Sequence, residues 1–96
     1  MKVRYSRPAL ADLDAILSDL ADKNPAAAAR FEARITQVEE RIGRFPDRFQ
    51  QVESRPAYRR VPLHRYPYLL FYTKAADEVI VLRILHGARK ETWEVL

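Results

Sequence analysis

The sequence contains no cysteine and only two glycines among its 96 residues. Without cysteine the chain can form neither a disulfide framework nor a thiolate metal site, which is typical of a protein of the reducing cytosol. Gly43 and Gly87 are too few and too far apart for a glycine-rich loop that cradles phosphates. His64 and His86 stand apart from other metal ligands. We therefore expect neither a metal nor a cofactor.

Long hydrophobic runs are also missing. The longest apolar stretches, at 68–72 and 79–82, are far shorter than the roughly 20 residues that cross a bilayer. Asp12 and Asp14 interrupt the apolar stretch that a secretion signal needs. We expect a soluble, cytoplasmic protein with no membrane partner. Its 48% hydrophobic and 31% charged residues predict that residues 1–96 fold as one domain with a modest core.

The chain is mildly basic, with a formal net charge of +4 and an isoelectric point of about 9.7. Most of the surplus lies in residues 51–96, which hold eight basic and five acidic side chains. Such a balance points to an acidic partner: nucleic acid, an acidic protein, or an enzyme that handles nucleic acid. The alternative is an ordinary solvated surface, because a small excess of lysine and arginine is common.

The first half of the chain has helical periodicity. Residues 2–6 alternate polar and apolar side chains, as a half-buried strand does. Apolar residues then recur at helical spacing over 10–20. A second helix is expected over 25–42, with Asn24 as its cap and Gly43 ending it in a left-handed turn. The short link between the helices predicts an antiparallel hairpin.

The second half reads as sheet. A polar connection over 45–56 precedes three runs rich in valine, isoleucine, leucine and tyrosine, at 58–63, 68–74 and 78–86. The short link at 75–77 predicts that the last two form an antiparallel hairpin. Pro62 has no amide hydrogen to donate, so its run is an edge strand or is bulged there. The expected fold class is α+β: an N-terminal strand, a two-helix hairpin on one face, and a three-stranded antiparallel run that completes one antiparallel sheet.

Basic and aromatic side chains on the expected strands suggest a binding surface. Because side chains alternate between the faces of a strand, rows of residues can be assigned to one side. If the rows share a face, one patch is formed by Arg60, Arg83, Tyr58, Tyr68 and Tyr72. Such a patch would hold phosphates and stack bases. The alternative is that the tyrosines are ordinary strand residues and the arginines are solvated.

Three residues near the C-terminus have two interpretations each. His86 follows Ile84 in the row expected to face the core, where it either closes the core through a hydrogen bond or serves as a general base. Arg89 lies just past Gly87, where the chain leaves the sheet, and is either a functional residue or a solvated one. Trp93 either docks the tail on the body or marks a partner surface.

Five segments follow one another in an order that suggests a known family. They are Tyr5 with Ala-Asp-Leu-Asp-Ala-Ile at 11–16, Asn-Pro-Ala-Ala at 24–27, Tyr-Arg-Arg at 58–60, Tyr-Leu-Leu-Phe-Tyr at 68–72, and Val-Leu-Arg-Ile-Leu-His-Gly-Ala-Arg at 81–89. Together they resemble the RelE/ParE toxin superfamily of type II toxin–antitoxin systems, and they look most like its ParE branch. The resemblance implies the fold expected above and a cognate antitoxin whose C-terminal segment wraps over the toxin. It also implies a role such as plasmid stabilization.

The resemblance leaves the target open between two classes of protein. ParE-like members inhibit growth by binding and poisoning DNA gyrase, whereas RelE-like members are metal-independent ribonucleases that cut ribosome-bound messenger RNA. If the chain is a ribonuclease, the candidate catalytic residues are Arg60 and Arg83 from the strand pattern, and His86 and Arg89 from the family resemblance. By family alignment, however, a catalytic arginine falls near Leu69, and residues 88–96 contain no tyrosine to match the family's C-terminal one.

This incomplete catalytic set favours a stoichiometric inhibitor of gyrase over an enzyme. The corresponding candidates for contact with the target are Arg83, Arg89, Lys90 and Trp93. A third reading is a non-toxic regulatory partner that binds an antitoxin.

Overall fold

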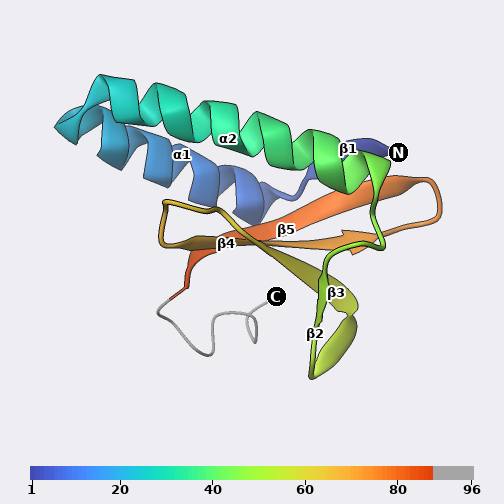
Figure 1. Ribbon diagram of the computed structural model, residues 1–96. Coiled ribbons are helices and arrows are strands. Elements are labelled where there is room, and N and C mark those ends of the chain that lie inside the picture. The colour runs from blue at the N-terminus through green and yellow to red at the C-terminus, as the bar shows by residue number, and fades with distance from the viewer. Residues whose placement is uncertain (88–96) are drawn as a thin grey trace.

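A helical hairpin covers one face of a five-stranded sheet in the computed structural model, which describes residues 1–87 (Figure 1). In chain order the elements are β1 (Lys2–Tyr5), α1 (Arg7–Lys23), α2 (Pro25–Arg44), β2 (Gln50–Val52), β3 (Arg55–Pro62), β4 (Tyr68–Lys74) and β5 (Glu78–His86). The strand order across the sheet is β1-β5-β4-β3-β2. The predicted α+β class and the predicted helical hairpin are therefore confirmed. No helix in the described part of the chain is both long and apolar enough to cross a membrane.

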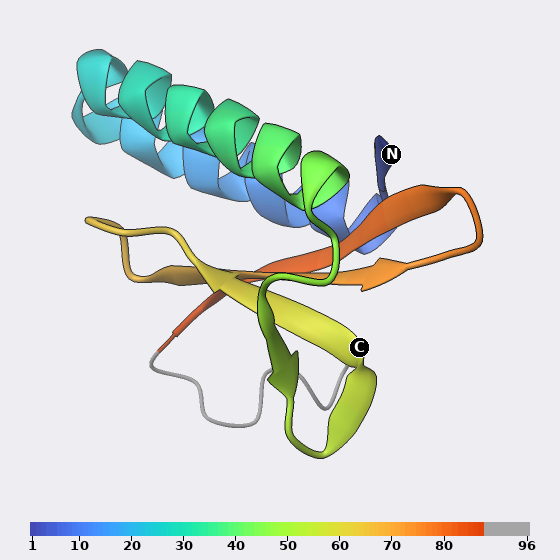
Figure 2. The ribbon, with the colours of Figure 1, turned by 45° about the vertical axis from the view of Figure 1, so that its right-hand side comes forward.

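Side-chain caps set where both helices begin. Ser6 accepts a hydrogen bond from the amide of Ala9 at 3.1 Å, and Asn24 accepts from the amides of Ala26 and Ala27 at 3.0 and 3.3 Å. Each cap satisfies amides that have no partner within the helix. The predicted restart at Asn24 is confirmed, and α2 buries Phe31, Ile35, Val38 and Ile42 against the sheet. The two helices lie side by side in one layer (Figure 2).

The prediction that Gly43 ends α2 in a left-handed turn is wrong. The helix continues to Arg44, and no glycine in residues 1–87 has a positive φ. Gly43 is buried, and its carbonyl accepts a hydrogen bond of 2.7 Å from the terminal amino group of Met1. A Cβ at this position would lie 2.8 Å from the carbonyl oxygen of Met1. Glycine is required here because the backbone before β1 approaches the helix so closely.

The sheet departs from the predicted antiparallel arrangement in two places. First, β1 pairs in parallel with β5, from Lys2 opposite Glu78 to Tyr5 opposite Val81. A parallel pair needs a long crossover, and the helical hairpin supplies part of it. Second, β2 lies within the stretch predicted to be a polar connection. It is only three residues long and mostly exposed, so it leaves no alternating pattern in the sequence.

Pro62 has a strand neighbour on one side only. β3 lies between β2 and β4, and its pairing with β2 reaches no further than Arg60. Pro62 lies opposite Leu69 of β4, past the end of β2. The prediction of an edge position thus holds for the end of β3 and is wrong for the rest of the strand. The loss of a donor at Pro62 removes no hydrogen bond to β2.

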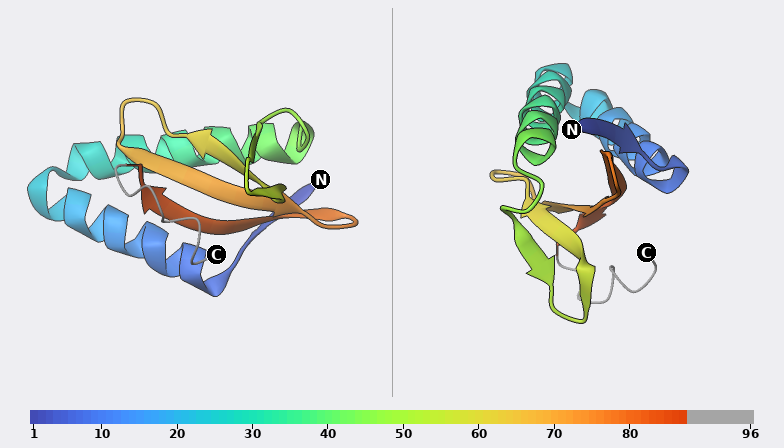
Figure 3. Two further views of the ribbon diagram at one scale, coloured as in Figure 1. Left: turned by 90° about the horizontal axis from the view of Figure 1, so that it is seen from below. Right: turned by 90° about the vertical axis from the view of Figure 1, so that its right-hand side faces the viewer.

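A bulge in β5 divides the buried side chains between the two faces of the sheet. Phe71 of β4 lies opposite Arg83, whereas the next residue, Tyr72, lies opposite Val81, so Leu82 is the extra residue. Val79, Val81 and Ile84 pack in the core beneath the helices. On the other face a smaller apolar cluster contains Val52, Phe71 and Leu85. Strict alternation would place Val79, Val81, Arg83 and Leu85 on one face of β5. The bulge breaks this alternation after Val81 and moves every later side chain to the opposite face. The end-on view shows both helices on one side of the sheet (Figure 3, right).

Candidate functional site

Past the end of β1, the backbone groups at the edge of β5 form hydrogen bonds with Ser6, which caps α1, and with Asp12 of α1. The backbone amide of Ser6 donates to the carbonyl of Val81 at 2.9 Å, and its hydroxyl donates to the carbonyl of Leu82 at 2.9 Å. Nearly two turns further along α1, the Oδ2 atom of Asp12 accepts from the amide of Ile84 at 2.9 Å. Side chains of the first helix therefore satisfy the backbone that β1 is too short to pair.

Arg83 is held at this edge by the same carboxylate. Its Nε donates to Oδ2 of Asp12 at 2.7 Å, and its Nη2 donates to Oδ1 at 3.0 Å. The two side chains are 24% and 15% exposed, so water screens the pair only partly. The hydrogen bonds to Asp12 raise the pKa of Arg83 above its ordinary value. A bidentate pair of this kind fixes the guanidinium group in one orientation, which makes Arg83 part of the contact between α1 and β5.

Arg60 and Arg83 lie on the same face of the sheet, away from the helices. Each is directly opposite Phe71, Arg60 from β3 and Arg83 from β5. The two Cα atoms are thus two strand spacings apart, or about 10 Å. Phe71 is 2% exposed and stands between them. The shared face agrees with the predicted patch, and Tyr58 packs against the apolar cluster of the same face.

The other two tyrosines of the predicted patch face the helices instead. Tyr72 is fully buried, and its hydroxyl donates to the carbonyl of Pro46 at 2.7 Å. Burial raises the pKa of Tyr72 to about 12. Tyr68 packs edge-on against Phe31 of α2, with ring centroids 5.8 Å apart. The prediction of a single patch with three tyrosines is therefore wrong, because Tyr68 and Tyr72 are core residues.

His86 ends β5 on the side of the sheet that faces the helices. It lies directly opposite Tyr68, and the two rings meet edge-on at 5.6 Å between centroids. The side chain is exposed. His86 and Arg83 are therefore on opposite faces of the same strand. The other C-terminal candidates, Arg89, Lys90 and Trp93, lie outside the described residues.

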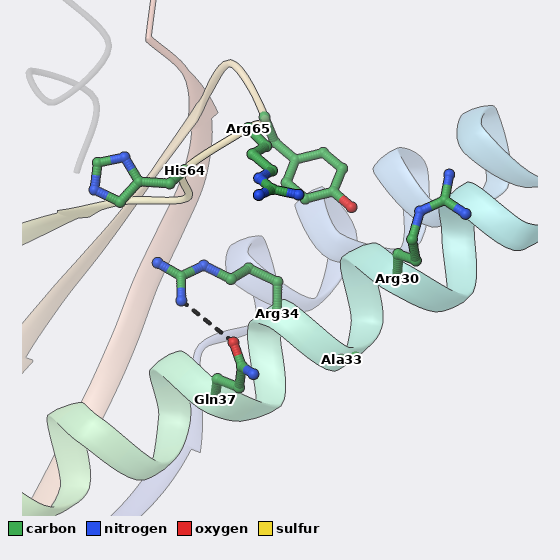
Figure 4. A pocket seen from close by; sticks show the side chains of 7 residues that line it. Arg30, Ala33, Arg34, Gln37, His64 and Arg65 are labelled. Atoms are coloured by element: carbon green, nitrogen blue, oxygen red, sulfur yellow. Dashed lines mark hydrogen bonds between the residues drawn. The ribbon is translucent and has the colours of Figure 1, made fainter.

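A hollow that the sequence predictions missed lies between α2 and the β3–β4 loop (Figure 4). It measures about 410 Å³ and is lined by Arg30, Ala33, Arg34, Gln37, His64, Arg65 and Tyr66. In Figure 4 a hydrogen bond, 3.3 Å long, joins the side chains of Arg34 and Gln37, and the side chain of Arg65 points toward Arg34 from the loop. A signal existed in the sequence: arginine recurs at 30, 34, 41 and 44, which is one side of a helix.

Arg65 adopts an uncommon backbone conformation at the rim of this hollow. Its φ is 76°, in the left-handed region that favours glycine. It sits third in a turn closed by the amide of Tyr66, which donates to the carbonyl of Leu63 at 2.9 Å. Glycine or asparagine is usual at this place in such a turn. In residues 1–87 no three histidine, aspartate or glutamate side chains are grouped to hold a metal ion.

The arrangement of two helices on one face of a five-stranded sheet is also found in a solved structure. A solved structure titled "Chromosomal ParDE TA system from P. aeruginosa" superimposes with a TM-score of 0.77, covering 90% of this chain and 95% of that one. The sequence identity is 24%, so this likeness shows the fold alone. No curated protein matches the chain.

The sequence itself identifies the family. The family model described as "ParE toxin of type II toxin-antitoxin system, parDE" matches residues 3–91. The chain therefore belongs to the ParE toxin family, the branch that its sequence motifs indicated.

Proposed function

We propose that this ParE-type toxin arrests growth by binding and poisoning DNA gyrase, without cutting RNA, and that a cognate antitoxin neutralises it. Membership of the ParE family supports the first part. The observation that carries the choice between gyrase and messenger RNA is the placement of Arg83 and His86 on opposite faces of β5. A ribonuclease needs its phosphate-holding groups and its general base around one scissile bond.

The engagement of Arg83 supports the same choice. Both of its hydrogen bonds to Asp12 are short, at 2.7 and 3.0 Å. A phosphate would have to displace a carboxylate that also accepts from the amide of Ile84. Arg60 shares the face of Arg83, but the two are about 10 Å apart, with Phe71 between them. Arg83 can join Arg60 in holding a phosphate only if its two hydrogen bonds to Asp12 break.

The test is a pair of assays on the same purified protein. We expect inhibition of DNA supercoiling by gyrase at near-stoichiometric toxin, with ribosome-bound messenger RNA left intact. Arg60→Ala and His86→Ala should retain gyrase inhibition, because in this proposal neither residue forms a catalytic site. Codon-dependent cleavage that disappears in either variant would refute the proposal in favour of a ribonuclease.

The antitoxin part has its own test in cells. Expression of the toxin alone should stop growth, and co-expression of the product of the adjacent gene should restore it. Harmless expression of a folded, full-length protein would contradict the toxin function and would favour a regulatory partner that only binds an antitoxin.

A further inference from the structure

The flanks of α2 differ in charge. At 3.6 residues per turn, Arg30, Arg34, Arg41 and Arg44 fall within an arc of about 80°. Glu32 and Glu39 occupy the opposite side of the helix by the same count. The arginine arc borders the β3–β4 loop, which contributes His64 and Arg65 to the first hollow.

The arginines continue past the first hollow along the helix. A second hollow, next to the first, is lined by Gln37, Glu40, Arg41, Arg44, Phe45 and Arg48. Arg48 lies over the ring of Phe45, with 4.7 Å from its guanidinium carbon to the ring centroid. We define the α2 basic face as Arg30, Arg34, Arg41, Arg44, Arg48 and Arg65. Glu40, the one carboxylate residue that lines either hollow, is 3.7 Å from Arg44.

This face has more donors than its own neighbours satisfy. The Nε atom of Arg34 is buried and has no hydrogen-bond partner within the described residues. The bond from Arg34 to Gln37 is long, at 3.3 Å. Within residues 1–87 the side chains of Arg30, Arg41 and Arg65 form no ion pair. Elsewhere arginines do have acidic partners, as Arg83 has Asp12 and Arg4 has Glu78.

We propose that the α2 basic face binds the phosphodiester backbone of a nucleic acid. From Arg30 to Arg44 the helix is about 21 Å long, which matches about six phosphates along one strand of a duplex. Four arginines lie along one flank of α2, with Arg48 and Arg65 beside them and one carboxylate residue among those that line the hollows. This arrangement suits a ligand with many regularly spaced negative charges. A single acidic side chain of a protein partner would neutralise only one of these arginines. The face binds without reading sequence, because contacts to phosphates carry no base information.

The proposal is independent of the choice between gyrase and the ribosome, since both work on nucleic acid. The α2 basic face would hold the toxin beside the nucleic acid on which the toxin's target acts. A positively charged row raises the rate of such an encounter and makes the affinity fall with salt.

The test measures fluorescence anisotropy of labelled nucleic acids of about 20 nucleotides with the full-length protein, over a salt range from about 50 to 200 mM. Duplex DNA, single-stranded DNA and single-stranded RNA form three arms, which distinguish the possible sources of the phosphodiester. The variant Arg30→Gln/Arg41→Gln/Arg65→Gln removes three exposed charges of the α2 basic face. The matched control, Lys2→Gln/Arg7→Gln/Lys23→Gln, removes three exposed charges from β1 and α1.

We expect the triple variant of the α2 basic face to bind at least roughly 100-fold more weakly near 0.1 M salt, because each lost contact removes about 0.7–0.9 decades of affinity between about 1 M and 0.1 M salt. Its slope of log affinity against log salt should fall by about 2.7 for a duplex or about 2.1 for a single strand, at 0.9 or 0.7 per lost contact. The control should change affinity by less than about 3-fold, because nonspecific steering depends only weakly on distant charge. Thermal unfolding of both variants checks that they are folded.

Two results would overturn the proposal. Equal weakening in both triple variants would mean that net charge alone attracts the nucleic acid. Loss of antitoxin binding in the α2 variant, with nucleic-acid binding unchanged, would assign the face to an acidic segment of a protein partner. Neither outcome depends on the gyrase assay, so the two proposals fail separately.

Discussion

Replacement of Asp12 by alanine should destabilise the protein more than any substitution of the arginine that it binds. The Asp12 carboxylate accepts three hydrogen bonds, two from the guanidinium group of Arg83 and one from the amide of Ile84. Alanine leaves all three donors without their acceptor, at a site where the Arg83 side chain is only 24% exposed. The perturbation therefore combines an unpartnered charge with an unsatisfied backbone amide at the bulge of β5.

The magnitude follows from these two losses. Removal of one partner from a buried pair costs about 3–5 kcal/mol, and partial access of water to Arg83 reduces that figure. An unsatisfied amide adds about 1–3 kcal/mol, again reduced where water can reach it. We expect Asp12→Ala to lower the free energy of unfolding by about 3 kcal/mol. Asp12→Asn keeps one acceptor for Ile84 and should cost about half as much.

Urea unfolding, followed by tyrosine and tryptophan fluorescence, measures these differences. Arg83→Ala should cost about 1.5 kcal/mol, because the carboxylate that remains still accepts from Ile84 and reaches water. The double variant closes a thermodynamic cycle, for which we expect a coupling energy of about 1–2 kcal/mol between Asp12 and Arg83. For a chain of this size, Asp12→Ala should also lower the melting temperature by about 12 °C or more.

Gyrase inhibition by Arg83→Ala tests whether Arg83 stabilises the fold or contacts the target. If Arg83 serves mainly to join α1 to β5, Arg83→Ala should inhibit gyrase as well as the wild type does, once activity is normalised to folded protein. A coupling energy near zero, or a loss of less than about 0.5 kcal/mol in Asp12→Ala, would be within the range of surface substitutions and would refute this reasoning. Arg83 would then be free to contact the target.

Three further outcomes test other parts of the fold. Gly43→Ala should lower the free energy of unfolding by about 1–3 kcal/mol in urea, because its Cβ would meet the Met1 carbonyl oxygen at 2.8 Å; a gain from better helix propensity would contradict this. Between pH about 10 and about 12 the unfolded chain loses the proton of Tyr72 while the folded protein keeps it, because burial raises the pKa of Tyr72 to about 12 in the folded state. Tyr72 should therefore lower the free energy of unfolding by up to about 1.4 kcal/mol per pH unit in this range. Tyr72→Phe should reduce the slope by this amount and leave the contribution of Tyr5, whose pKa burial also raises. Arg65→Gly should raise the melting temperature, by relief of about 1 kcal/mol of strain at its φ of 76°, and a lower melting temperature would show that Arg65 makes contacts that outweigh that strain.

The helices were readable from the sequence because their signals are local. Asn24 and the proline after it mark a cap within three residues, and the apolar stripe of α2 repeats over 20 residues. A cap and a stripe depend on neighbours along the chain, so no knowledge of tertiary contacts is needed to find them. Gly43 is the exception, since its role comes from the distant Met1 rather than from the end of the helix.

The faces of the sheet were harder because one bulge changes them. Leu82 carries no mark of a bulge in its sequence, yet it reverses the orientation of every later residue in β5. His86 shares a face with Ile84, as predicted, because both residues follow the bulge and the period of two holds between them. The partner of Arg83 could not be found either, because Asp12 is 71 residues away and no local pattern links a helix carboxylate to a strand arginine.

Two groups of arginines within residues 1–87 differ in whether carboxylates bind them. Arg83 and Arg4 have short bidentate or paired contacts to carboxylates that join β5 to α1 and to β1, so their charge is largely used within the fold. In the α2 basic face, four arginines lie on one flank of α2 and two, Arg48 and Arg65, lie in the adjoining loops, with one carboxylate residue among those that line the two hollows. A net charge of +4 is small for the whole surface, but repulsion among charges on that flank raises the cost of leaving them without counter-ions. A polyanion relieves this repulsion and releases its own condensed ions. The sequence pattern predicted an acidic ligand on the sheet face with Arg60 and Arg83, yet the arginines of the α2 basic face gain more from such a ligand, because fewer carboxylates neutralise them.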